Sequence, residues 1–116
     1  MTEHQWVSRS SKCCYEAIKS DADTNATYMQ FASMAYAKFL HCSDFSRRQY
    51  AQRHLADKLK VFIIRSTVES SSFEQFDNVA QKLILSLLEE VNWYEVSGKM
   101  LVDYERSQNI SVNRIL

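Results

Sequence analysis

The chain has 116 residues, of which 14 are basic and 14 acidic, so its formal net charge is zero. That length predicts a single domain spanning residues 1–116 with its own apolar core. The neutral balance argues against nucleic acid or an anionic membrane surface as a partner. Proline is absent and Gly98 is the only glycine, which favours an all-α fold over β architectures that use both residues at turns.

The first half of the chain predicts three amphipathic helices, because apolar residues recur at helical spacing. These helices are expected over residues 3–20, 25–42 and 44–65. The second has so broad an apolar face that we expect it to be buried on more than one side. The basic residues of the third, which include Arg47 and Arg48, are predicted to form a solvated helix face.

The second half contains the most apolar segment. After a predicted loop at residues 66–72, Ser72-Phe-Glu-Gln75 is a capping-box sequence that opens a helix reaching Val91. Its apolar content predicts the central helix of a compact bundle. A second capping box, Asn92-Trp-Tyr-Glu95, predicts a sharp turn and a further helix. Residues 107–116 either add a final turn or dock on a partner.

Targeting and redox features are few. The N-terminus is polar, and no apolar run approaches the roughly 18 residues of a membrane span, so we expect neither a secretory signal nor an integral membrane anchor. Three cysteines, of which Cys13 and Cys14 are adjacent, argue against a disulfide framework and favour a reducing compartment.

No residue pattern indicates catalysis. A di-iron site in a helical bundle needs Glu-x-x-His pairs, but Lys38 stands three residues before His41 and Ala51 three before His54. We therefore expect His4 and the other two histidines to be surface or interfacial residues. Neither neighbouring thiol has a base visibly beside it, and the carboxylates are scattered. The sequence predicts no enzymatic activity, no metal and no cofactor.

Two stretches, taken in order, resemble the Bcl-2 family of apoptosis regulators. Ser72-Phe-Glu-Gln-Phe-Asp-Asn-Val79, running on to Val91-Asn-Trp93, is similar to the helix and the Asn-Trp-Gly-Arg sequence at the centre of the family's BH1 motif. Ser43-Asp-Phe-Ser-Arg-Arg48 resembles the end of its BH3 motif. The spacer between the two is several residues longer than in the family. The resemblance covers residues 43–96, about half of the chain.

The resemblance implies a bundle around one apolar helix, with a surface groove that binds an amphipathic BH3 helix from a partner. The partner-binding residues that it implies are Phe45, Tyr50, Leu55, Phe76, Val79, Leu83, Asn92, Trp93, Glu95 and Val96. Core packing is the alternative role for each groove residue.

The sequence departs from the family's pattern at two positions after Asn92-Trp93. The family's glycine is replaced by Tyr94 and its arginine by Glu95. That arginine pairs with an aspartate of the bound helix, which Glu95 would repel unless Lys99 or Arg48 compensates. The later tryptophan-glycine motif and a hydrophobic tail are also missing.

By resemblance, the leading hypothesis is a divergent, virus-encoded inhibitor of host apoptosis. It would sequester BH3-containing pro-apoptotic host proteins in the host cytoplasm, and reach mitochondria through those partners. The alternative is a self-associating helical scaffold or adaptor, such as a homodimer, without a ligand groove. Neutral charge and an abundance of aromatic residues are compatible with that alternative. A metal-binding bundle is the third hypothesis.

Overall fold

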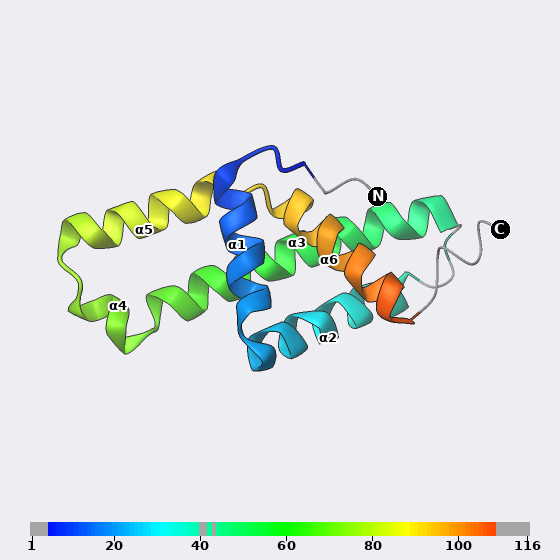
Figure 1. Ribbon diagram of the computed structural model, residues 1–116, viewed down its shortest axis with the longest axis horizontal. Helices are drawn as coiled ribbons and strands as arrows, with labels where there is room; N and C mark the ends of the chain where they lie inside the picture. The colour runs from blue at the N-terminus through cyan, green and yellow to red at the C-terminus, as the bar shows by residue number, and fades with distance from the viewer. Residues whose placement is uncertain (1–4, 40–41, 43, 109–116) are drawn as a thin grey trace.

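The computed structural model describes residues 5–39, 42 and 44–108, except for the side chains of residues 44 and 45. All regular structure in these ranges is helical, which confirms the predicted all-α helical bundle. The helices are α1 (Arg9–Ser20), α2 (Ala22–Lys38), α3 (Asp44–Val68), α4 (Ser71–Gln75), α5 (Asn78–Glu90) and α6 (Trp93–Gln108). The molecule measures 53 × 29 × 24 Å, and α3 extends along its longest axis (Figure 1).

The first two helices meet at a sharp corner. Ser8 caps α1 by accepting a hydrogen bond from the Ser11 N–H at 3.1 Å, so α1 begins later than the predicted residue 3. Asp21 ends α1 and caps α2, because its carboxylate accepts a 3.0 Å hydrogen bond from the Thr24 N–H. The predicted polar break at residues 20–25 is therefore reduced to one residue.

The predicted helix over 72–91 is two helices. Asp77 accepts a hydrogen bond from the Ala80 N–H at 2.8 Å and so starts α5, while Phe76 before it has an extended backbone. Ser70, rather than Ser72, caps α4. The predicted loop is also shorter, because α3 continues to Val68.

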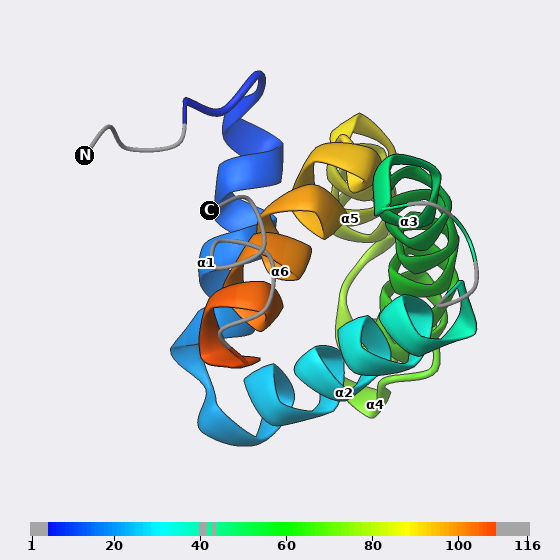
Figure 2. The same ribbon diagram turned by 90° about the vertical axis from the view of Figure 1, so that its right-hand side faces the viewer.

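The core is formed by α1, α2, α3 and α6. Helix α6 contacts each of the other three, and Figure 2 shows it between them. The buried apolar side chains of this core are Ile18, Tyr28, Ala32, Ala35, Tyr36, Ala51, Leu55, Ala56, Leu59, Val91, Trp93, Val96, Met100 and Leu101. Four of them are alanines on α2 and α3, and small side chains allow helix axes to approach closely. At Gly98, a Cβ atom would lie 2.4 Å from Nε2 of Gln52, so α6 also approaches α3 closely there.

The expectation that the 72–91 segment forms the central helix is wrong for this structure. None of the residues of α5 is buried, and the helix runs along the edge of the molecule (Figure 1). Its partly buried Leu88 packs against the core, but the buried core side chains belong to the other four helices and to Val91 at the end of α5. A high apolar content favours burial of a segment against other protein surface. It does not show whether that surface belongs to the same chain.

The prediction that the basic residues of α3 form a solvated face is wrong at Arg47. Arg47 is 7% exposed, and its guanidinium lies 4.9 Å from the ring centroid of Tyr36. An arginine can bury its stem and stack its planar charge on an aromatic face, which stabilises it away from water. Arg48 is partly buried, whereas Arg53, Lys58 and Lys60 are exposed as predicted.

Candidate functional site

A group of exposed apolar side chains follows α4 and α5, which we call the α4–α5 arm (residues 71–90). Phe76 is 48% exposed, Val79 68%, Leu83 61% and Leu87 57%. The last three are spaced four residues apart and therefore form one row along α5. In a monomer, the exposed area of this row gains nothing from the hydrophobic effect.

A groove of about 360 Å³ lies between the arm and the end of α3. Its lining residues are Tyr28, Ile63, Ser66, Thr67, Ser70, Ser72, Phe73, Phe76 and Ile84. Tyr28 and Phe73 are buried, and four serine or threonine residues border the groove. The side chain of Gln81 donates hydrogen bonds to the carbonyl oxygens of Phe73 at 3.0 Å and Phe76 at 3.1 Å, which hold the corner between α4 and α5.

The residues that the resemblance implied for partner binding divide into two groups. Phe76, Val79 and Leu83 are exposed and lie together on the arm. A second set is buried in the core: Leu55, Trp93 and Val96. The structure does not combine the two sets in one groove.

The remaining implied residues lie elsewhere. Tyr50 is 46% exposed and its ring packs against Phe39, with 5.7 Å between centroids. Asn92 is exposed and caps α6, accepting a hydrogen bond from the Glu95 N–H at 3.1 Å. The side chain of Phe45 lies outside the part of the chain that the structure describes.

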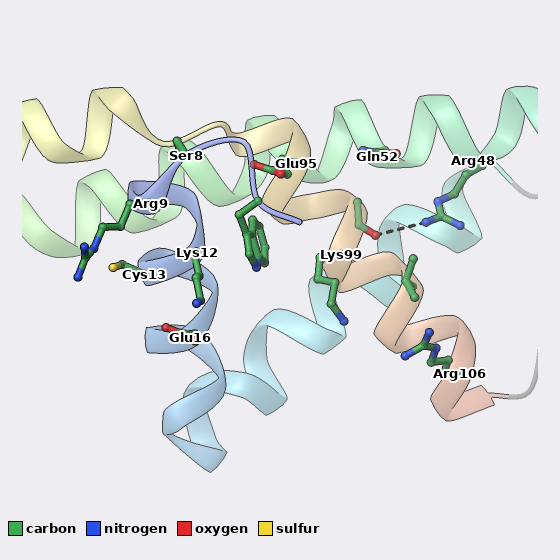
Figure 3. A pocket seen from close by; sticks show the side chains of 13 residues that line it. Ser8, Arg9, Lys12, Cys13, Glu16, Arg48, Gln52, Glu95, Lys99 and Arg106 are labelled. Atoms are coloured by element: carbon green, nitrogen blue, oxygen red, sulfur yellow. Dashed lines mark hydrogen bonds between the residues drawn. The ribbon is translucent and has the colours of Figure 1, made fainter. Parts of the chain in front are cut away.

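Glu95 borders a second, polar depression, an open cleft of about 1400 Å³ between α1, α6 and the first half of α3 (Figure 3). It is lined by Trp6, Ser8, Arg9, Lys12, Cys13, Glu16, Arg48, Gln52, Glu95, Gly98, Lys99, Val102 and Arg106. The Glu95 carboxylate accepts a 2.8 Å hydrogen bond from the Val7 N–H. A carboxylate in the first turn of α6 is also stabilised by the helix dipole.

The two cations considered as compensation for Glu95 have other carboxylate partners. Lys99 lies 2.9 Å from the carboxylate of Asp103, and Arg48 pairs with the buried Glu105. Arg48 also donates to the carbonyl oxygen of Gly98 at 3.3 Å, drawn as the dashed line in Figure 3. The Arg48–Glu105 pair joins α3 to α6, and the Lys99–Asp103 pair lies within α6. Both therefore have a structural role at the cleft.

Asp103 is the centre of a small charged network. Tyr15 donates a hydrogen bond to its carboxylate, Lys99 lies 2.9 Å away and Lys19 3.2 Å away. Burial raises the pKa of Asp103, but these hydrogen bonds and positive charges lower it more, so the net pKa is below the usual value. Burial and the hydrogen bond to Asp103 raise the pKa of Tyr15.

The pKa values of Cys14 and His54 are both shifted toward the uncharged form. Burial and the neighbouring Cys13 raise the pKa of Cys14 to about 11, so its thiol is protonated at neutral pH. Burial and the charges of Lys38 and Lys58 lower the pKa of His54. His4 and His41 lie outside the described residues.

Over residues 5–39, 42 and 44–108, no group of three or more His, Cys, Asp or Glu side chains could hold a metal ion. In the same part of the chain, no helix is long and apolar enough to cross a bilayer.

Sequence reasoning missed part of the apolar surface. Leu87 continues the four-residue spacing of Val79 and Leu83, so the periodicity alone could have identified it. Val61, Phe62 and Val68 on the second half of α3 are also substantially exposed. Val61 is two residues from the buried Leu59 and faces nearly the opposite side of the helix, so periodicity separates these two, whereas Phe62 lies on the apolar stripe that the sequence predicts to be buried.

Comparison of the chain with models of protein families, with curated proteins and with solved structures finds no match.

Proposed function

We propose that this chain is a protein-interaction module that binds an amphipathic helix of another polypeptide through the α4–α5 arm. The observation that carries the proposal is the uncovered row of Val79, Leu83 and Leu87 on a helix with no buried residue. Single apolar side chains are ordinary on protein surfaces, but a continuous row at helical spacing is typical of helix-binding surfaces. Such a function uses apolar area and shape, with no chemical step.

The resemblance to the Bcl-2 family makes the BH3 helix of a pro-apoptotic host protein the first ligand to test. The exposure of Phe76, Val79 and Leu83 supports this choice. Leu55 and Val96 are fully buried, so a BH3 helix would lie on the arm and not over those two residues. Binding of this kind would make the chain an inhibitor of host apoptosis.

Calorimetric titration of the protein with a panel of BH3 peptides tests the proposal. We expect at least one peptide to bind with sub-micromolar affinity, and Leu83→Asp to weaken it by about tenfold or more, because a buried charge opposes docking. Met34→Asp on α2 is the matched control, since Met34 is 56% exposed and lies outside the arm. Circular dichroism should show both variants folded.

Two outcomes would contradict the proposal at different levels. If no peptide of the panel produces heat or a change in melting temperature, BH3 helices are not the ligand. If a peptide binds but Met34→Asp weakens it as much as Leu83→Asp does, the arm is not the binding surface.

A further inference from the structure

The second half of α3 presents an apolar face of its own. Val61 is 54% exposed, Phe62 39% and Val68 42%. Phe62 is anchored in an aromatic cluster, its ring 5.7 Å from that of Tyr28 and 5.1 Å from that of Phe31. It therefore offers a fixed apolar contact rather than a mobile one.

The second half of α3 has a small excess of positive charge, with Lys58, Lys60 and Arg65 against Asp57 and, just after the helix, Glu69, whereas the arm has an excess of negative charge. Exposed cations stand on α3 at Lys58 and Arg65, which share a helix face with Val61 and Val68 because they are three or four residues apart. On the arm, exposed carboxylates belong to Glu74, Asp77, Glu89 and Glu90. Lys82 is the only cation between residues 71 and 90.

The area of the two faces fits a stable protein interface. Seven apolar residues on the arm and on α3 are between 39% and 68% exposed. At roughly 150–200 Å² for each fully exposed residue, they leave on the order of 600 Å² open to solvent. Summed over both faces, this approaches the roughly 800 Å² that each partner buries in a standard interface.

From these observations, and resting on the proposed function of the arm, we propose that the helix bound by the α4–α5 arm is the second half of α3 in a second copy of this chain. The contact would be reciprocal, so that two copies of α3 and two of α5 form a four-helix cluster. Pairing of α5 with α5 is disfavoured, because it would bring Glu89 and Glu90 near carboxylates of the other copy.

Sedimentation equilibrium of the purified chain over a range of concentrations provides the first test. We expect a monomer–dimer equilibrium that shifts toward monomer at high salt and is weakened about tenfold or more by Leu83→Asp, with Met34→Asp unchanged. A chain that remains monomeric at every concentration overturns the inference.

Charge reversal tests which helices pair. One variant, Glu89→Lys with Glu90→Lys, makes the arm basic, and a second, Lys58→Glu with Arg65→Glu, makes the α3 face acidic. All four side chains are exposed. Each variant alone should dimerise about tenfold more weakly, because like charges then meet, whereas an equimolar mixture should form heterodimers close to wild-type strength.

The outcomes also separate this inference from the proposed function. If the arm variant self-associates as tightly as the wild type, and mixing gives no preference for heterodimers, pairing of the arm with α3 is wrong. If the chain is monomeric but a BH3 peptide binds in a manner sensitive to Leu83→Asp, the proposed function holds and only the second-copy inference fails. If neither self-association nor peptide binding occurs, both fail.

Discussion

The hydroxyl oxygen of Ser11 accepts a hydrogen bond from the backbone N–H of Asn92 at 2.8 Å. Ser11 is fully buried, and its oxygen also lies 2.7 Å from the hydroxyl of Ser8. This contact joins the start of α1 to the turn between α5 and α6, which are 81 residues apart in the chain. It therefore fixes where the α4–α5 arm connects to the core.

We expect Ser11→Ala to destabilise the fold by about 1–2 kcal/mol, because a backbone N–H loses its partner in a partly buried position. The free energy of unfolding in urea measures the effect. Ser10→Ala is the matched control, since the Ser10 hydroxyl makes only an exposed 3.4 Å contact with Glu90. Equal losses for the two variants would show that the Ser11–Asn92 contact does not stabilise the fold.

The turn at Asn92 shows what sequence reasoning can reach. The predicted capping box is half present, because Asn92 accepts from the Glu95 N–H as expected. The return bond is missing, since the Asn92 N–H donates to Ser11 and the Glu95 carboxylate accepts from Val7. Local spacing predicts the hydrogen bond from the Glu95 N–H to Asn92. It does not predict that Ser11, on a distant helix, accepts the hydrogen bond of the Asn92 N–H.

Helix type and approximate bounds were predictable for the same reason, since spacing and caps are local properties. Whether each apolar side chain is buried or exposed was not predictable. Leu55 and Leu83 both occupy the apolar stripe of an amphipathic segment, yet Leu55 is 0% and Leu83 61% exposed. The difference depends on which helices complete the core, a long-range property. This is why the implied groove residues separate into buried and exposed groups.

Asp103 should make stability depend on pH. Its pKa is lower in the folded state than the ordinary aspartate value, so its stabilising contribution is present above that ordinary value. The contribution is lost as the pH falls toward the folded-state pKa, where the carboxylate is protonated. Removing the charge with Asp103→Asn should therefore cost about 1–2 kcal/mol at neutral pH and progressively less as the pH falls below the ordinary aspartate pKa.

Urea titrations of both proteins across this acidic range measure the difference. Asp57→Asn serves as the control, since Asp57 is exposed on α3. A gap between wild type and Asp103→Asn that stays constant with pH would contradict the assignment of the network to the ionised carboxylate.

Arg48 and Glu105 form a pair in which only one member is well buried. The side chain of Glu105 is 6% exposed and that of Arg48 31%. Arg48→Met would leave the carboxylate without its cation, and because Arg48 is partly solvated we expect a loss between those of exposed and fully buried pairs, about 2 kcal/mol. Adding Glu105→Leu should recover part of this loss, because no charge is then left unpaired.

A double-mutant cycle in urea measures this coupling. Losses that simply add, so that the double variant is as unstable as the sum of the single ones, would show that the two side chains do not interact. Lys60→Met, at an exposed site on the same helix, controls for the loss of a positive charge from α3.

Leu55→Ala and Leu83→Ala compare the same deletion in the core and on the arm. Removing the fully buried Leu55 side chain should cost about 2–5 kcal/mol, from lost apolar burial and the cavity left behind. Leu83 is mostly exposed, so its truncation should change the unfolding free energy of the monomer by less than about 0.5 kcal/mol. Both are measured in urea at protein concentrations low enough to exclude self-association. A loss for Leu83→Ala comparable to that for Leu55→Ala would mean that α5 is packed inside the monomer, and the arm would then not be available to a partner.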